Sequence, residues 1–134
     1  MKRREIREQI FKLLFRVEFN EIIEMEQQKA LALDDEECKA NEKDKEEISA
    51  KLDSIVEILP EIDQIIKDNM EGWTIERVGK VELTILRLAV YEIKYDESVP
   101  DTVAINEAVE LSKKYGQEDA GSFVNGILAK VIKA

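Results

Sequence analysis

Apolar residues recur every three or four positions along most of this 134-residue chain, which is the spacing that places them on one face of an α-helix. Alternation of apolar and polar residues is not the prevailing pattern, and glycine (5) and proline (2) are scarce. The pattern therefore predicts an all-α protein. The helical segments that we expect are residues 3 to about 20, 22–33, 48–66, 81–95, 102–115 and 119–132, with a short turn at 74–78.

Two stretches of this pattern indicate how the helices are arranged. Pro60 lies inside the helical spacing of residues 48–66, and a proline in that position kinks or divides a helix. Residues 81–95 are apolar almost all the way round, which is typical of a central, buried helix. Glu92 falls within the main apolar stripe of that helix, so we expect it to have a partner inside the protein.

The first helix carries two apolar stripes, whereas a helix that packs one face into a core needs only one. The main stripe consists of Ile6, Ile10, Leu13, Leu14 and Val17. The second stripe lies nearly opposite and consists of Phe11, Phe15 and Phe19, spaced four residues apart. The second stripe meets either another helix of the same protein or a partner, and both interpretations stay open.

The segment 34–47 is almost wholly polar, with eight acidic residues against three lysines. We interpret it as a solvated linker or an exposed helical turn. It lacks the spacing and the turn glycine of a calcium loop, so we do not expect a metal site there.

Composition narrows the class of protein. The 44% of hydrophobic residues suffices for one domain or two small subdomains. The chain has no histidine and a single cysteine, Cys38, which excludes an intrachain disulfide and a Cys/His zinc site. No nucleophile elbow or phosphate-binding loop occurs, so we expect a non-enzymatic protein without metal or cofactor.

No apolar run approaches the roughly 18 residues of a membrane-spanning helix. The basic start of the chain lacks the apolar stretch of a signal peptide. We therefore expect a cytoplasmic protein that does not engage a membrane.

Positive charge is concentrated at one end of an otherwise acidic chain. The formal net charge is -10, yet four of the first seven residues are basic, namely Lys2, Arg3, Arg4 and Arg7. Positive charge in a first helical turn opposes the helix macrodipole, so helix stability does not account for these residues. Because Arg4 and Arg7 fall near the side of the second apolar stripe, the pattern favours an anionic partner such as RNA. A solvated, frayed terminus is the plainer alternative.

The last expected helix contains a second candidate binding site. Asp119 and Phe123 lie four residues apart, along one edge of its buried stripe. A charged residue beside an aromatic one suits a stacked base or ordinary packing, and the pattern by itself favours ordinary packing. Asn125-Gly126 alone would suggest a hairpin turn, but the helical spacing on both sides overrules it, and we expect Gly126 to mark close helix packing.

Several blocks of sequence resemble the NusB family of bacterial transcription antitermination factors, in the order and spacing of that family. The blocks are LRLAVYEI (86–93), Val99-Pro100, AINEAVEL (104–111) and FVNGIL (123–128). Arg3-Arg4 with Arg7-Glu8, and Trp73 ahead of Arg77, extend the resemblance, which covers residues 2–19 and 73–132.

The resemblance implies a single NusB-like domain, residues 1–134, of about seven helices. It would consist of two small helical subdomains, one over about 1–70 and one over about 71–134. The resemblance also implies a non-enzymatic role. With NusE, a small-subunit ribosomal protein, the family binds the boxA element of nascent RNA. Within the RNA polymerase antitermination complex it helps the polymerase read through terminators, chiefly in ribosomal RNA operons.

Carried over residue by residue, the resemblance assigns two groups of side chains. It implies RNA contact by Lys2, Arg3, Arg4, Arg7, Asp119 and Phe123. It implies contact with NusE by Phe15 in the first helix and by Glu82.

Two alternatives stay open. A similar helical module precedes the catalytic domain in a family of ribosomal RNA cytosine methyltransferases, and this alternative would require an S-adenosylmethionine-binding catalytic domain after the module. The other alternative is a module that binds only proteins, through the stripe of phenylalanines. The same stripe could close a homodimer, so the sequence leaves the oligomeric state open.

Overall fold

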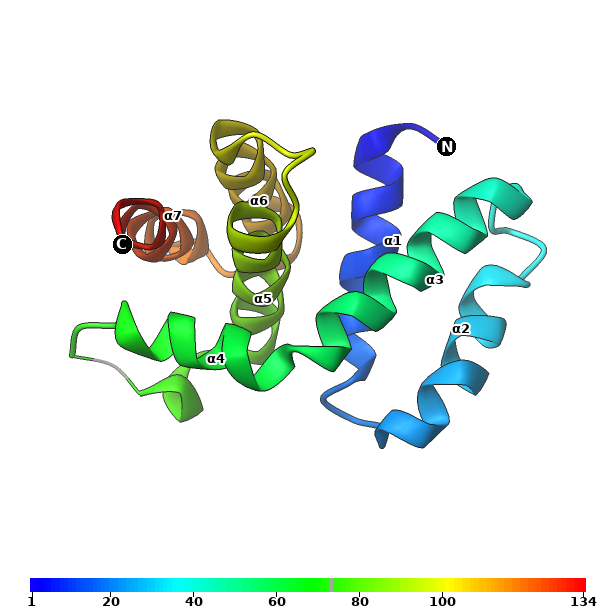
Figure 1. Cartoon of the computed structure of the whole chain (residues 1–134), viewed down its shortest axis with the longest axis horizontal. Coiled ribbons are helices and arrows are strands. Elements are labelled where there is room, and N and C mark those ends of the chain that lie inside the picture. The colour runs from blue at the N-terminus through cyan, green and yellow to red at the C-terminus, as the bar shows by residue number, and fades with distance from the viewer. Residues whose placement is uncertain (73) are drawn as a thin grey trace. The chain divides into compact units, whose positions relative to one another are not determined.

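The computed structural model describes residues 1–72 and 74–134, and Trp73 lies outside the described residues. These residues form α-helices and short 3-10 turns without a strand, which confirms the all-α prediction (Figure 1). The helices are α1 (Arg3–Arg16), α2 (Met25–Leu33), α3 (Glu42–Glu57), α4 (Leu59–Asp68), α5 (Lys80–Tyr95), α6 (Asp101–Tyr115) and α7 (Ala120–Lys133), with 3-10 turns η1 (Ile22–Glu24) and η2 (Ile75–Arg77).

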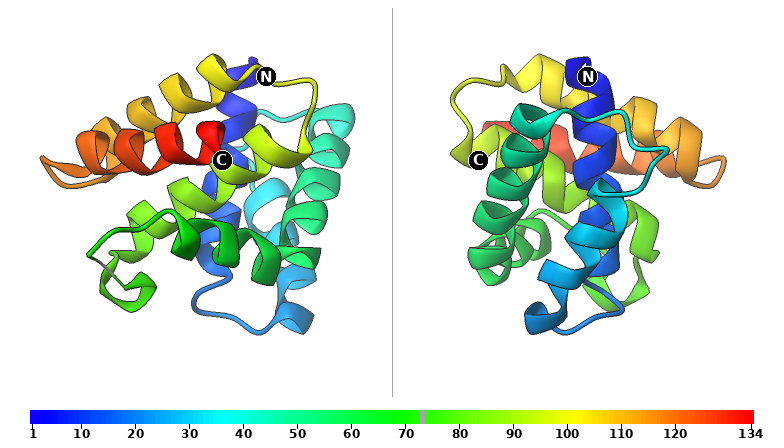
Figure 2. Two further views of the ribbon diagram at one scale, coloured as in Figure 1. Left: turned by 60° about the vertical axis from the view of Figure 1, so that its left-hand side comes forward. Right: turned by 90° about the vertical axis from the view of Figure 1, so that its right-hand side faces the viewer.

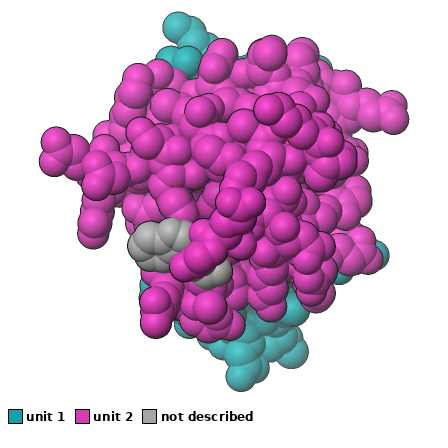
Figure 3. Space-filling view, turned by 90° about the vertical axis from the view of Figure 1, so that its left-hand side faces the viewer, with its two compact units in different colours: residues 1–57 teal, residues 58–134 magenta. Residues whose placement is uncertain are grey.

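The chain divides into two compact units, Met1–Glu57 and Ile58–Ala134, which Figure 3 colours separately. The boundary that we expected lay near residue 70, at the end of α4. The structure groups α4 with the second unit because α4 packs against α5 and α7. Buried Ile62 and Ile66 face that packing, and the Arg87 guanidinium of α5 donates to the Asp63 carboxylate of α4 at 2.8 and 2.9 Å.

Unit 1 is built around α1, which packs against α2 and α3 (Figure 2). The predicted main stripe of α1 is buried from Ile6 to Leu14, whereas Val17 is half-buried because it already caps the helix. The predicted second stripe does not form one surface. Phe11 is buried in the core, Phe15 is half-buried, and Phe19 is exposed.

Side-chain hydrogen bonds to the backbone mark the end of α1 and the start of α3 in unit 1. We expected the first helix to reach about residue 20, but it ends at Arg16. The Asn20 side-chain amide donates to the Arg16 carbonyl at 2.9 Å. In a longer helix this carbonyl would accept from the backbone N–H four residues later, so the side chain takes the place of that donor.

The acidic segment is not wholly a solvated linker, because its second half begins α3. The Asn41 side-chain oxygen accepts from the Asp44 backbone N–H at 2.8 Å, and the Asp44 carboxylate accepts from the Asn41 N–H at 3.2 Å. This reciprocal cap starts the helix. It also leaves Asp44 buried rather than solvated.

Pro60 divides the helical stretch as predicted. The helix α3 ends at Glu57 and α4 begins at Leu59, which puts the proline in the first turn of α4. Its missing N–H costs nothing there, because the first N–H groups of a helix have no partner within it.

In unit 2, α5 is the central helix and contacts α4, α6 and α7. It is buried from Leu83 to Val90 and again at Glu92, which is 1% exposed, as the all-round apolar pattern predicted. No buried side-chain polar atom of the described residues lacks a hydrogen-bond partner. The helices α6 and α7 lie side by side (Figure 2).

The prediction of close helix packing at Gly126 is wrong, since Gly126 is exposed and a Cβ there would have nothing within 4 Å. The glycine at a close approach is Gly116, which follows α6. A Cβ at Gly116 would lie 2.6 Å from the Ala120 Cβ and 2.8 Å from the Ser112 carbonyl oxygen. The turn from α6 into α7 is therefore too tight for a side chain.

No helix among residues 1–72 and 74–134 combines the length and the apolar character that crossing a bilayer requires.

Candidate nucleic-acid interface

The basic segment lies at the start of α1, in unit 1. Lys2 precedes the helix, Arg3 and Arg4 are exposed in its first turn, and Arg7 is half-buried one turn later. The Glu5 carboxylate accepts from the Lys2 backbone N–H at 3.3 Å. An acidic group at this position favours the helix start that the arginines oppose.

The start of α1 is held in place rather than frayed. The buried N-terminal ammonium of Met1 donates to the Asp44 carboxylate at 2.9 Å. The hydrogen bond from that ammonium, together with the Asn41 N–H, holds the pKa of Asp44 below its usual range. The plainer interpretation of the basic segment, a loose solvated terminus, therefore does not describe this structure.

Acidic residues of α3 meet the basic segment. The Arg3 guanidinium donates to Glu47, with nitrogen–oxygen distances of 2.9 and 2.7 Å to the two carboxylate oxygens. This hydrogen bond is the main reason that the pKa of Arg3 is raised. The Arg3 side chain is nevertheless 72% exposed, so an anion in solution can approach it.

The aromatic residue assigned to NusE, Phe15, also belongs to unit 1. Its ring meets the Phe19 ring edge to face, with centroids 5.1 Å apart and an interplanar angle of 60°. Because Phe11 is buried, the accessible aromatic side chains of this stripe are Phe15 of α1 and Phe19, which follows the helix.

A hollow of about 450 Å³ on unit 2 brings together three of the predicted residues, Glu82, Asp119 and Phe123. Gly79 precedes α5 and Glu82 lies in its first turn, while Asp119 precedes α7 and Phe123 follows one turn later. The described residues that line the hollow are Arg77, Val78, Gly79, Glu82, Gln117, Asp119, Ala120 and Phe123.

The Glu82 side chain of this hollow lies close to Gly116. A Cβ at Gly116 would lie 3.3 Å from a Glu82 carboxylate oxygen, so the Glu82 side chain rests against the glycine. The residue assigned to NusE and the two assigned to RNA thus share one concave surface. An aromatic face beside two carboxylates can stack a base and accept hydrogen bonds from its amino groups.

Sequence reasoning missed two residues that line this hollow. Arg77 was noted only as part of the family resemblance, and Gln117 carried no signal at all. Arg77 is the one basic residue among the described residues of the hollow, and it comes from the 3-10 turn η2. Only the spacing from Trp73 to Arg77 could have drawn attention to it.

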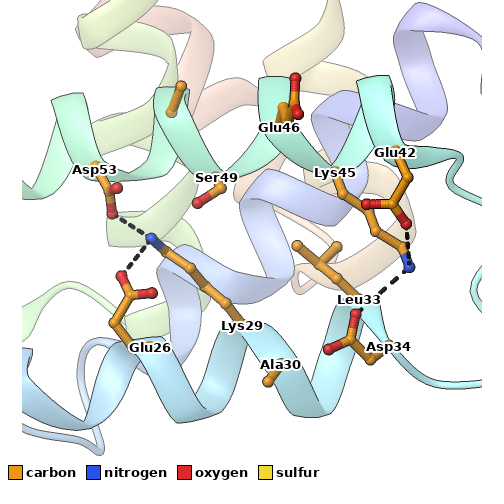
Figure 4. A pocket seen from close by; sticks show the side chains of 11 residues that line it. Glu26, Lys29, Ala30, Leu33, Asp34, Glu42, Lys45, Glu46, Ser49 and Asp53 are labelled. Atoms are coloured by element: carbon orange, nitrogen blue, oxygen red, sulfur yellow. Dashed lines mark hydrogen bonds and ion pairs between the residues drawn. The ribbon is translucent and has the colours of Figure 1, made fainter.

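A second hollow, of about 510 Å³, separates α2 from α3 in unit 1 (Figure 4). Two lysines bridge it. Lys29 contacts Glu26 at 2.8 Å and Asp53 at 2.6 Å, and Lys45 contacts Asp34 at 3.4 Å and Glu42 at 3.6 Å. Burial alone would lower the pKa of Lys29, but its hydrogen bonds to the two carboxylates together outweigh burial and raise it.

The carboxylates of Glu26, Asp53, Asp34 and Glu42 point toward the lysines, and that of Glu46 points away from them, so these groups do not converge on a common centre (Figure 4). Within the part of the chain that the structure describes, no three metal-ligating side chains come together. We therefore interpret the second hollow as an electrostatic connection between α2 and α3.

Comparison with known proteins identifies the family to which the chain is similar. The model of the NusB family matches residues 4–133. The transcription antitermination protein NusB of Lachnoclostridium phytofermentans is 52% identical over 132 residues, which are 98% of this chain and 99% of that protein. The protein of the same name from Agathobacter rectalis is 48% identical over 130 residues, 97% of this chain and 98% of that protein.

Among solved structures, NusB of T. maritima superposes with a TM-score of 0.88 at 38% identity, covering 99% of this chain and 92% of that one. A crystal structure of the antitermination factors NusB and NusE in complex with dsRNA contains a chain with a TM-score of 0.82 at 30% identity, covering 98% of this chain and 96% of that one.

These relatives are transcription factors matched over nearly their full length, which confirms the expectation of a non-enzymatic protein. The chain belongs to the NusB family.

Proposed function

We propose that this protein is a transcription antitermination factor that binds boxA RNA together with NusE. Within the RNA polymerase antitermination complex it promotes read-through of ribosomal RNA operons in the cytoplasm. Full-length similarity to proteins named as transcription antitermination proteins carries this proposal. The grouping of Glu82, Asp119 and Phe123 in one hollow, and the pinned basic segment of α1, support it.

In this proposal single-stranded boxA RNA contacts surfaces of both units. Lys2, Arg3, Arg4 and Arg7 pair with its phosphates, while a base stacks on Phe123 beside Asp119. Single strands suit such surfaces because their unpaired bases can stack on aromatic side chains, each contributing about 1–3 kcal/mol. The related complex with NusE holds double-stranded RNA, so both forms of RNA belong in the test.

NusE would bind through Phe15 and Glu82. A ribosomal protein carries positive charge because it binds RNA, and this chain has a net charge of -10. Complementary charge speeds association and fixes orientation. Joining two weak RNA-binding surfaces in one complex then raises the affinity for RNA beyond that of either protein.

A gel shift with NusE present tests the proposal. It compares single-stranded boxA RNA, its duplex form and a scrambled strand of equal length. We expect the boxA strand to bind more tightly than the scrambled strand. Equal binding of these two strands would contradict sequence-specific recognition. Loss of every RNA shift with NusE binding intact would favour the module that binds only proteins.

The same assay tests the basic segment. We expect replacement of Arg3, Arg4 and Arg7 by glutamine to weaken RNA binding about tenfold or more, because three phosphate contacts are lost. The matched control replaces three exposed lysines elsewhere, Lys67, Lys113 and Lys133, and removes the same charge. An equal effect of the two triple variants would show that only net charge matters.

A further inference from the structure

Two isoleucines at the connection between α1 and α2 are exposed to solvent. Ile22 is 69% exposed and Ile23 is 84% exposed, and Phe19, just before them, is 60% exposed. The neighbouring Met25 is buried, so this segment turns its methionine inward and its isoleucines outward. A fully buried isoleucine stabilises a fold by about 1.5–3 kcal/mol, and Ile22 and Ile23 do not make this contribution because they are exposed. We call Phe19, Ile22 and Ile23 the turn patch.

The turn patch is displayed on an ordered turn. The Glu24 carboxylate accepts from the Glu21 N–H at 3.2 Å, and the Glu24 N–H donates to the Glu21 carbonyl at 2.9 Å, which closes the 3-10 turn η1. The Arg16 guanidinium donates to the Gln28 side chain and carbonyl at 3.1 and 3.3 Å and so ties α1 to α2. A partner would therefore meet a surface whose conformation is already set, which favours binding.

The turn patch continues the surface of Phe15. The Phe19 ring contacts the Phe15 ring edge to face at 5.1 Å, and Ile22 begins η1 three residues after Phe19. Contiguous exposed apolar side chains with a polar rim mark protein interaction sites. The turn patch thus adjoins the residue through which the proposed function has NusE bind.

The charges around the turn patch identify the chemistry of its partner. Between Arg16 and Lys29 the charged residues are all acidic, and they are Glu18, Glu21, Glu24 and Glu26, of which Glu26 pairs with Lys29. Such a rim repels RNA phosphates. It also disfavours a second copy of this chain, because a two-fold contact would bring the same carboxylates together. A positively charged protein segment is the complementary partner.

We propose that the turn patch is part of the NusE-binding surface and takes a cationic segment of NusE whose apolar side chains cover Ile22 and Ile23. This inference rests on the proposed function, which supplies NusE as the partner. It adds binding residues outside α1 and outside the hollow of unit 2, and it predicts that the glutamates around them steer association.

The affinity of purified NusE for the full chain tests the inference by titration calorimetry. We expect the double replacement Ile22→Ser and Ile23→Ser to weaken NusE binding on the order of tenfold to a hundredfold, because the apolar anchors are lost. Both side chains are exposed, so the fold should persist, and a thermal melt checks that it does. The control is Val103→Ser, an exposed apolar residue of unit 2, which should leave the affinity within about twofold.

A second variant tests the charge complementarity. Glu24→Gln keeps the oxygen that accepts from the Glu21 N–H but removes the charge. We expect slower association with NusE and a weaker dependence on salt. An association rate unchanged by Glu24→Gln would overturn the proposal that the partner segment is cationic.

Each remaining outcome has a definite meaning. If wild-type protein binds NusE and the isoleucine variant binds it equally well, the inference fails while the proposed function stands. If wild-type protein does not bind NusE at all, the proposed function loses its partner and the inference falls with it. If light scattering finds a wild-type dimer that the isoleucine replacements dissociate, with NusE affinity unchanged, a second copy covers the turn patch and the inference is overturned.

Discussion

Arg3 is the residue at which internal pairing would compete with the RNA binding that we propose. Its guanidinium contacts both oxygens of Glu47, yet the side chain is largely exposed. An exposed ion pair of this kind contributes about 0–1 kcal/mol to stability. A phosphate could therefore displace Glu47 at little cost, so in the proposed function Glu47 would be an internal competitor of RNA.

Replacement of Glu47 by glutamine should raise RNA affinity. Without the competing charge, Arg3 is available to phosphate, and the gain corresponds to about two- to fivefold for a surface pair. Fluorescence anisotropy with labelled boxA RNA measures it. Glu97→Gln, an exposed acid between α5 and α6, removes the same charge elsewhere and should change the affinity less. A fall in affinity for Glu47→Gln would mean that Glu47 positions Arg3 for RNA.

Individual site residues could be predicted to different degrees. The basic segment is visible in the sequence because its charge contrasts with an acidic chain. The pairing of Arg3 with Glu47 was not predictable, because the two residues are 44 positions apart and meet only through the packing of α1 on α3. Arg77 and Gln117 belong to the hollow of unit 2 through folding alone.

At the scale of elements, the connection between α6 and α7 depends on a glycine that only the structure identifies. A Cβ at Gly116 would meet the Ser112 carbonyl oxygen at 2.8 Å, and this backbone atom cannot move cheaply. The helical Gly126, by contrast, has free space around it.

Two alanine replacements should therefore act in opposite directions. Gly116→Ala should lower the free energy of unfolding by about 1–3 kcal/mol, as overpacking does. Gly126→Ala should raise it by about 0.5–1 kcal/mol, because alanine favours a helix over glycine. Urea unfolding measures both. Equal effects of the two replacements would contradict the close approach at Gly116.

The helices themselves could be predicted from periodicity, but several of their ends could not. Helical spacing and Pro60 correctly predicted the division between α3 and α4. The end of α1 and the start of α3 depend on the side chains of Asn20 and Asn41, which hydrogen-bond to the backbone. The boundary between units depends on the contact of α4 with α5, which no local pattern reveals.

For the whole molecule, the decisive property is a strong net negative charge with one basic segment. About three phosphate contacts on single-stranded RNA predict a slope near -2 in a plot of log affinity against log salt, from roughly 0.7 per contact. Because this electrostatic contribution is small, we expect the chain to bind RNA weakly by itself.

Salt titration of boxA binding tests this. We expect a slope near -2 for the chain alone, and a steeper slope with NusE because the partner adds phosphate contacts. The triple variant that lacks Arg3, Arg4 and Arg7 should lose most of the slope. A variant slope equal to that of the wild type would place the phosphate contacts elsewhere on the protein.

The capture of the Met1 ammonium by Asp44 has a practical consequence for anyone who produces this protein. An affinity tag fused ahead of Met1 would turn the ammonium into an uncharged amide and leave the buried Asp44 carboxylate without its cation. Such a tag would loosen the arginines beside it and understate RNA binding. A tag after the exposed Ala134 leaves that end of α1 untouched and is the better choice for every measurement proposed above.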